Sequence, residues 1–571
     1  MTTNQPRRAL SEDESPTRSA EGTATAAAEP AAPPASTPVM NPSPSGDYLS
    51  HRQILVVMGG LMAGMFLAAL DQSIVATALP RITSELGGLD KLSWVVTAYL
   101  LTSTAATPLW GKISDLRGRR PMFQAAIVVF LIGSLICGFS PEIADFLNLS
   151  GINVMIAGRA VQGLGAGGLM SLALAIIGDV IPPRERGKYQ GFFAAVFGVS
   201  SVAGPLLGGW FTDNWGWEWI FFINIPIGIA ALIVTSLALK LHHVRRQASV
   251  DYLGAATIVG SVTSLVLYLS WAGPDKGWTS ATGIWLLVGT VVLAALFVLV
   301  ESRAKEPIIP LELFKHWTFT SNIIFAMIMG IGMFGGLIFL PIYLQAVKGL
   351  SATHSGLAIL PLVVGIFTTS IGGGQIMSRT GRYKWMPITG ALVVGLALFA
   401  FSTLQVNTPY WRVALIMYAF GMGLGLTMQV VVTAVQNSVD RRHMGVATAS
   451  VTFFRSMGGA IGTALLGAIL NIRLKHHLSE IVGATGHGAA GQINTNDVTA
   501  IQALPEPIKS LVLEAFTRSM DDVFLVAVPF MAVAFIIALT MREKPLRGRG
   551  QHSDSATTSA SPDSELASMT H

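Results

Sequence analysis

The chain contains little charge and almost no cysteine. Only 12% of its 571 residues are charged, whereas soluble proteins carry roughly 25%. The single cysteine, Cys137, excludes a disulfide framework and a thiolate metal site. No glycine-rich loop ends in Lys-Ser or Lys-Thr, so we do not expect ATP as an energy source. No catalytic or metal-ligand motif stands out, and we expect neither an enzyme nor a cofactor.

Long apolar runs fill most of the chain, which is 51% hydrophobic. A membrane-spanning helix needs about 20 mostly apolar residues. On this basis we predict an all-α integral membrane protein with fourteen spans. They are 54–79, 92–110, 122–139, 154–177, 189–210, 219–239, 252–271, 284–300, 319–344, 355–377, 385–404, 413–435, 446–472 and 523–540.

The basic residues between the spans predict the orientation. If the N-terminus is cytoplasmic, 26 of the 37 Lys and Arg fall in cytoplasmic segments and nine in outer segments, as the positive-inside rule requires. We therefore expect a multi-pass protein of a bacterial plasma membrane with both termini inside. Residues 1–50 and 542–571 are rich in small polar residues and are expected to be disordered cytoplasmic tails.

An internal repeat divides the spans into two sets. The turn 111–119 recurs at 374–382 with its glycines and arginine in register, but with serine in place of Asp115. Three glycines of span 5 recur 254 residues later in span 13: Gly191, Gly204 and Gly208 correspond to Gly445, Gly458 and Gly462. Transporters commonly contain such repeats, with a binding site between them near mid-membrane.

The repeat predicts the domain boundaries. We expect a six-helix bundle at 51–240, a two-helix insert at 241–305, and a second six-helix bundle at 306–541. The second bundle includes a long outer loop, 473–520. Within this loop, apolar residues at helical spacing predict an amphipathic helix, which we expect on the outer leaflet, with a lid or docking role as the alternative. These residues are Ile508, Leu511, Val512, Ala515 and Phe516.

Three charged residues lie inside predicted spans. Asp71 is an acid about 12 Å below the outer edge of span 1, and Arg159 lies at a similar depth in span 4. Buried ionisable residues in a membrane are functional candidates, and burial favours the neutral form of a carboxyl group. Asp71 can therefore take up and release a proton, and Arg159 can neutralise the carboxylate. Arg455 in span 13 could hold a second station for a proton or an anion; the alternatives are structural pairing for Asp71, helix anchoring for Arg159 and snorkelling for Arg455.

The turn after span 2 carries a dense charge pattern. A carboxylate among arginines on the cytoplasmic face can form a network that closes one state and breaks in another. We call this predicted network the latch. Its residues are Gly111, Asp115, Arg117, Gly118, Arg119 and Arg120.

Span 5 combines glycines with a proline. Proline inside a helix removes a hydrogen bond, and glycines allow close contact between helices. We expect a packing surface where the two halves separate. Its residues are Gly191, Gly204, Pro205, Gly208 and Gly209.

With these motifs, the chain resembles the fourteen-span drug:proton antiporter branch of the major facilitator superfamily over residues 51–541. The turn 111–121, the span 1 sequence from Leu70 to Pro80, Arg159-x-x-Gln162-Gly163-x-Gly165 and Gly204-Pro205-x-x-Gly208-Gly209 match that family's motifs. The resemblance implies proton transfer at Arg159 and a substrate cavity lined by spans 1, 4, 9 and 12. Candidate cavity residues are Gln162, Phe334, Tyr343, Gln345, Met422, Met428 and Gln429.

The favoured hypothesis is a proton-coupled antiporter, acting as a monomer, that exports amphipathic drugs, antiseptics or antibiotics. An exporter of a lipid, siderophore or endogenous metabolite is the alternative. A transporter-like receptor without transport is a third hypothesis, which retention of Asp71 and Arg159 disfavours.

Overall fold

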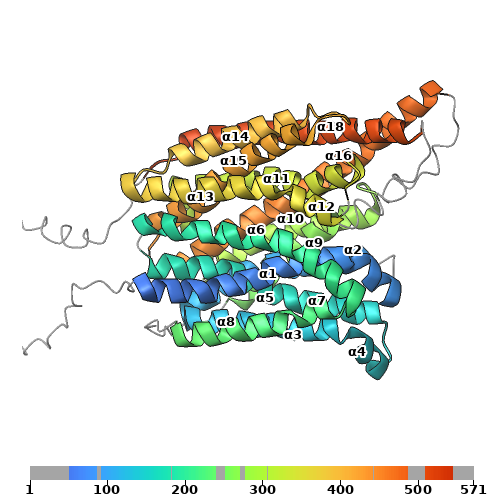
Figure 1. The fold of residues 1–571 in the computed structure, drawn as a ribbon. Helices are drawn as coiled ribbons and strands as arrows, with labels where there is room; N and C mark the ends of the chain where they lie inside the picture. Colours follow the sequence, from blue (N-terminus) through green and yellow to red (C-terminus); the bar gives the residue numbers. More distant parts are fainter. Residues whose placement is uncertain are drawn as a thin grey trace, which may run out of the picture. The chain divides into compact units, whose positions relative to one another are not determined.

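The computed structural model describes residues 51–86, 92–181, 183–238, 251–269, 277–304, 307–350, 352–440, 443–485 and 508–543. All of them belong to the unit Asp47–His571. Within these ranges the regular structure is helical, and the long helices run side by side (Figure 1). The predicted tails, apart from 542–543, lie outside the described residues.

The helices fall into three groups along the chain. The first contains α1 (His51–Leu86), α2 (Leu92–Arg117), α3 (Arg119–Gly138), α4 (Ser140–Leu147), α5 (Gly151–Val180), α6 (Pro183–Asn214), α7 (Trp219–Phe222) and α8 (Asn224–Ala238). The second contains α9 (Tyr252–Leu267) and α10 (Ala281–Glu301). The third contains η3 (Leu311–Lys315), α11 (Trp317–Ala346), α12 (Ala352–Ala358), α13 (Leu360–Thr380), α14 (Trp385–Phe401), α15 (Tyr410–Ser438), α16 (Met444–Thr485) and α18 (Ile508–Thr540).

Every predicted span falls largely on one of these helices or on a pair of them. Ten described helical segments are long and apolar enough to cross a membrane, and three shorter ones are also apolar. The helix α2 has 26 residues but a more mixed composition. The molecule is therefore a multi-pass helical protein, while the count of fourteen spans stays a prediction.

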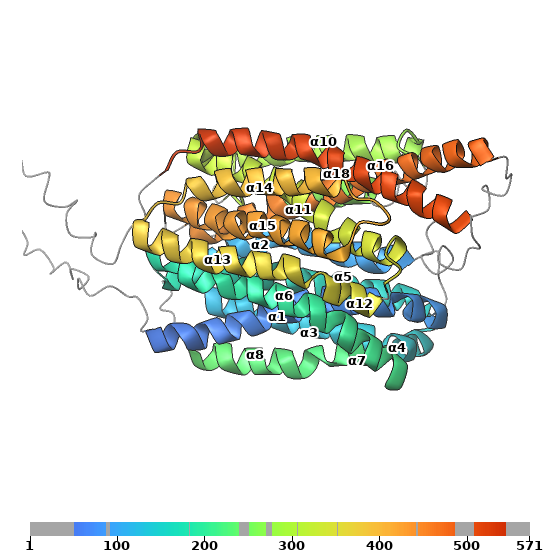
Figure 2. The same cartoon turned by 45° about the horizontal axis from the view of Figure 1, so that its top comes forward.

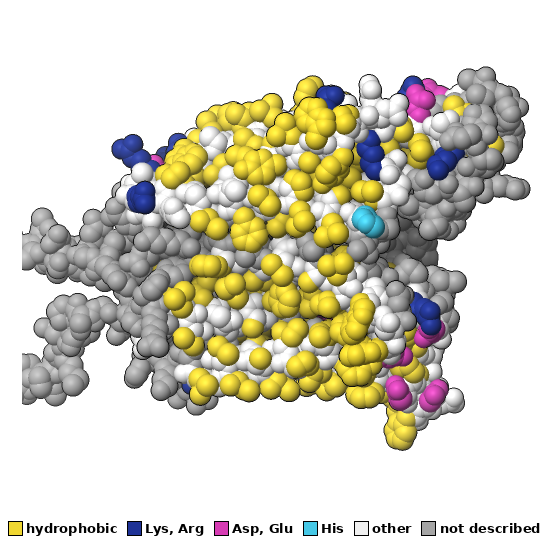
Figure 3. Space-filling view, in the orientation of Figure 1, with side chains coloured by type: hydrophobic (Ala, Val, Ile, Leu, Met, Phe, Trp, Pro, Cys, Tyr) yellow, Lys and Arg dark blue, Asp and Glu magenta, His cyan; other side chains and the backbone are white. Residues whose placement is uncertain are grey.

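The surface matches a membrane environment. On the face shown in Figure 3, hydrophobic side chains cover the middle, and charged side chains gather toward the two ends. The helix α10 has the most exposed apolar surface, since only 6% of its most apolar stretch is buried in the protein. Such a helix must pack against lipid, because its exposed apolar surface would not be tolerated in water.

Each of the two large groups of helices has its own core. Two buried clusters lie within α1–α8, and the largest cluster lies almost entirely within α11–α18. A smaller cluster joins α2, α9 and α16 through residues such as Ala105, Ile258 and Phe453. The inserted helix α9 thus packs where the two groups meet, beside α2 (Figure 1). In Figure 2, α3, α7 and α8 of the first group lie on the lower side of the molecule, and α14 and α18 of the third group lie on the upper side.

The prediction for the outer loop was partly wrong. Residues 508–516 are helical, but they form the first turns of α18 rather than a separate helix on the outer leaflet. Their apolar face is buried in the protein: Val512, Ala515 and Phe516 are at most 4% exposed. The helix α16 also continues to Thr485, so the predicted loop is helical at both ends.

Candidate functional site

Asp71 lies at the centre of a buried polar network inside the first group of helices. Its side chain is fully buried in α1. One carboxylate oxygen accepts a hydrogen bond from Arg159 Nη1 at 2.5 Å, and the other accepts from Gln162 Nε2 at 2.8 Å. Asn224 Nδ2 lies 3.3 Å from the second oxygen. The predicted pairing of Asp71 with Arg159 is therefore present as a direct ion pair between α1 and α5.

The Arg159 guanidinium is held on several sides. Its Nη1 also donates to Gln162 Oε1 at 2.6 Å, and its Nε lies 3.4 Å from the Val95 carbonyl oxygen. The guanidinium carbon lies 4.3 Å from the centre of the Tyr99 ring, in the range of a cation–π contact. Counting the Asp71 ion pair, four polar or aromatic contacts therefore replace water around this buried charge.

Two further residues complete the network and were missed by the sequence analysis. Ser134 Oγ of α3 accepts hydrogen bonds from Gln162 Nε2 at 2.6 Å and from Asn224 Nδ2 at 3.1 Å. Among the described residues, the buried Oδ1 atom of Asn224 has no hydrogen-bond partner. The only signal in the sequence was an isolated polar residue in an apolar span. Gln162, predicted in the substrate cavity, is fully buried in this network instead.

The predicted latch joins the two groups of helices. The Asp115 carboxylate of α2 accepts hydrogen bonds from the backbone nitrogens of Gly445 at 3.1 Å and Val446 at 2.9 Å, at the start of α16. A carboxylate is favourable there because the first amides of a helix lack partners inside the helix. A Cβ at Gly111 would collide with Ala449, so this glycine allows α2 to approach α16 closely.

Only one of the three latch arginines pairs with Asp115. Arg119 Nη2 lies 2.5 Å from Asp115, and its Nε lies 2.6 Å from Asp179 of α5. Gly118 has a φ of 100°, a value that glycine adopts readily, and it allows the tight turn that places Arg119. Among the described residues, Arg117 and Arg120 form no ion pair, and their part in the network stays a prediction.

A second contact supports the same end of the interface. Gln436 of α15 donates from Nε2 to the Leu174 carbonyl oxygen of α5 at 3.0 Å and to Thr448 Oγ1 at 3.0 Å. A Cβ at Gly178 would collide with the Gln436 side chain. The α2–α16 and α5–α15 contacts together hold the two groups of helices against each other at this end.

The glycines of α6 do not all serve the predicted packing role. A Cβ at Gly204 would collide with Ser73 of α1, whose hydroxyl donates to the Ser200 carbonyl oxygen at 2.8 Å. A Cβ at Gly209 would meet nothing within 4 Å, so this glycine makes no close contact. Gly208 is buried, and Pro205 lies inside the continuous helix. The surroundings of Gly191 lie outside the described residues.

These two glycines give a matched pair of variants. We expect Gly204→Val to reduce transport at least ten-fold, because the new side chain would push α6 away from α1. Gly209→Ala should retain wild-type transport within about two-fold, since nothing obstructs its Cβ. Transport should be measured at equal amounts of membrane-inserted protein. Equal losses in both variants would show that the motif, rather than the Ser73 contact, governs the effect.

Several predicted cavity residues pack elsewhere. Tyr343 is 1% exposed and donates to the Gln405 carbonyl oxygen, while Gln345 donates to Ser355 Oγ at 3.0 Å. Phe334 packs against Gly459 of α16, and Met422 lies at the α13–α15 contact, where its carbonyl oxygen accepts from Thr369. The side chain of Gln429 lies outside the described residues.

Met428 does line a cavity, and so does Arg455. This cavity lies between α11, α15 and α16, well inside the third group of helices. No contact joins Arg455 to the Asp71 network among the described residues. The predicted assignment of Arg455 to proton coupling therefore has no support from the geometry.

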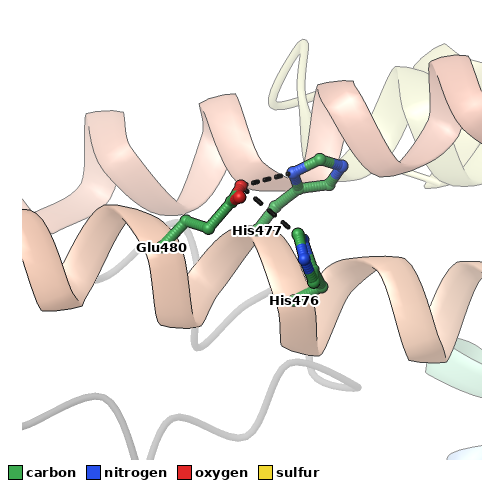
Figure 4. Close-up of side chains that lie close together, drawn as sticks. All are labelled: His476, His477 and Glu480. Carbon is green, nitrogen blue, oxygen red and sulfur yellow. Dashed lines mark hydrogen bonds and ion pairs between the residues drawn. The ribbon is translucent and has the colours of Figure 1, made fainter.

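Among the described residues, one group could hold a metal ion: His476, His477 and Glu480 on α16 (Figure 4). His477 Nδ1 lies 3.3 Å from Glu480, and its Nε2 lies 3.0 Å from Asp522 of α18. Both ring nitrogens of His477 therefore already have carboxylate partners. His477 thus links α16 to Asp522 of α18. The arrangement gives no reason to infer a bound metal ion.

The comparisons with known proteins decide the family. The sequence pattern of the Major Facilitator Superfamily matches residues 61–252 and again 252–463. The chain belongs to the major facilitator superfamily.

Several members of this superfamily align with most of the chain. The chain is 39% identical over 501 residues to an uncharacterized MFS-type transporter of Mycobacterium tuberculosis, covering 88% of this chain and 71% of the relative. It is 36% identical over 526 residues to the multidrug transporter protein MdtP of Bacillus subtilis, covering 87% and 94%. Others at 31–33% identity are named a multidrug resistance protein and efflux pumps.

Solved structures support the same fold. A proton:xylose symporter of the major facilitator superfamily superposes with a TM-score of 0.56 at 15% identity, covering 87% of this chain and 98% of that one. The family match and the named relatives make the protein a major facilitator superfamily efflux transporter and not an enzyme.

Proposed function

We propose that the protein is a proton-coupled antiporter that exports amphipathic small molecules, such as drugs, antiseptics or antibiotics, across the plasma membrane. The observation that carries the proposal is the fully buried Asp71 carboxylate, paired with Arg159 and bonded by two amides. A buried acid in a membrane helix is a candidate proton carrier. The names of the efflux relatives favour export of drug-like substrates.

The Asp71 network can accommodate both protonation states. With Asp71 ionised, Arg159, Gln162 and Asn224 all donate to it. A protonated Asp71 needs an acceptor instead, and rotating the Asn224 amide brings its unpartnered Oδ1 toward the carboxyl group. Proton uptake also removes the charge that balances Arg159, which weakens the link between α1 and α5.

The position of α1 connects this network to the interface between the halves. Two residues after Asp71, Ser73 contacts the Ser200 carbonyl oxygen and the Gly204 site of α6. Six residues before Gly204 on α6, a Cβ at Gly198 would collide with Val363 of α13 in the other half. A movement of α1 upon protonation would therefore be passed through α6 to α13. This route is a hypothesis built on contact alone.

The deciding experiment measures transport in energised inverted membrane vesicles. We expect uptake of an amphipathic dye such as ethidium against its gradient, accompanied by proton release from the vesicle lumen. Collapsing the proton gradient with an uncoupler should abolish the uphill uptake, whereas removing ATP while a respiratory substrate maintains the gradient should not. Vesicles lacking the protein serve as the control. Uphill uptake that survives the uncoupler would reject proton coupling.

A further inference from the structure

A cation without a counter-ion among the described residues lines a cavity in the third group of helices. Arg455 of α16 lines this cavity together with residues of α11 and α15. Three methionines, Met329, Met333 and Met428, form much of the remaining wall. Methionine side chains adapt to apolar groups of different shape.

Among the described residues, nothing neutralises Arg455. It makes no hydrogen bond and no ion pair there, and no acid is among the cavity-lining residues. Thr427 is the other polar residue of the wall, and its hydroxyl already donates to carbonyl oxygens of its own helix. On α16 itself, the first acid after Arg455 is Glu480, about 37 Å farther along the helix.

An uncompensated guanidinium in a membrane helix is energetically unfavourable. Arg455 lies eleven residues after Met444, the first residue of α16, which corresponds to about 17 Å along the helix. That distance is more than an arginine side chain can span, so the guanidinium does not reach the start of α16. A counter-ion that enters the cavity from outside would remove the cost.

The backbone around Arg455 is held in place by close helix contact. A Cβ at Gly330 of α11 would collide with the Arg455 carbonyl oxygen, and a Cβ at Gly458 would collide with the Met327 carbonyl oxygen. The helices α11 and α16 therefore approach closely on both sides of Arg455. This close contact fixes the backbone of Arg455 relative to the cavity wall.

We propose that Arg455 binds the anionic group of an amphipathic organic acid, while the methionine-lined cavity binds its apolar body. The guanidinium presents paired donors that match a carboxylate. The inference rests on the proposed export function and names a substrate class for it. It also replaces the proton role first expected of Arg455, because an arginine keeps its proton and cannot release it.

Binding to the purified full chain in phosphatidylcholine nanodiscs tests the proposal without a proton gradient. The probes are naphthylacetate and naphthylacetamide, which have the same shape but differ in charge. Arg455→Gln should weaken naphthylacetate binding about ten-fold or more and leave naphthylacetamide binding unchanged within about two-fold. Arg455→Lys should give an intermediate loss, because it keeps the charge without the paired donors. Arg412→Gln, at an exposed position of α15, is the matched control.

The outcomes separate this site from its competitors. Equal weakening of both probes, or none, would overturn the proposal. Full displacement of naphthylacetate by chloride or acetate would show a counter-ion site without an apolar subsite and overturn it as well. Loss of naphthylacetate binding in nanodiscs containing phosphatidylglycerol would assign the cavity to a lipid headgroup. Because no gradient is present, failure of proton coupling would leave the binding result untouched.

Discussion

Replacing Asp71 with asparagine should reduce substrate-induced proton release to the level of vesicles without the protein. The amide cannot carry the proton, and Arg159 is then left as a buried charge without its partner. Removing one partner of a buried ion pair destabilises a protein by about 3 to 5 kcal/mol. The measurement is proton release upon substrate addition, normalised to the amount of protein that remains membrane-inserted and folded.

A double variant separates coupling from folding. Asp71→Asn combined with Arg159→Gln removes both charges, so it should recover much of the lost stability and still release no protons. Asp145→Asn, which neutralises an exposed acid on α4, is the control and should behave as wild type. Proton release at the wild-type rate in the folded double variant would contradict the role proposed for Asp71.

The sequence predicted the helices and the central ion pair well, for physical reasons. Apolar length identifies a membrane helix because the bilayer thickness sets it. The equal depths of Asp71 and Arg159 followed from the rise per residue along helices that run in opposite directions. Both arguments use only distance along the membrane normal. In a helix, that distance follows from the number of residues.

What the sequence could not predict depends on how each helix is rotated. Asn224 reaches Asp71, and Ser134 joins the same network through Asn224 and Gln162, yet neither differs from other small polar residues in apolar spans. Tyr343 and Gln345 were assigned to a cavity by helix position, but they face loops and α12. Side-chain direction is fixed by packing between helices, and that packing is not readable from one sequence.

Two other misinterpretations had different causes. The apolar face of 508–516 fits a lipid surface and a protein core equally well, and the structure places it in the core. The latch carboxylate was expected among three arginines, but its partners across the interface are backbone amides of Gly445 and Val446. Every residue except proline has such an amide, so no side-chain pattern could indicate this contact.

This backbone contact leads to the second large expected effect. Asp115→Ala should lower the transport rate about five-fold or more and open the latch end of the molecule. A carboxylate that caps a helix start contributes about 1 to 2 kcal/mol, which corresponds to roughly a 5- to 30-fold shift between the closed and open states. Arg119 keeps Asp179 as a partner, so the variant should still fold.

Spin labels measure the opening directly. Cysteines replace Arg117 at the end of α2 and Asp440 after α15, both exposed, in a background where the buried Cys137 is changed to serine. We expect Asp115→Ala to lengthen the distance between the labels in a larger fraction of molecules. Asp115→Glu should keep most of the short-distance population, because its carboxylate can still reach the α16 amides. If Asp115→Ala transports at the wild-type rate with an unchanged distance distribution, the contact with α16 does not control the closed state, and Asp115 serves only to hold Arg119 in place.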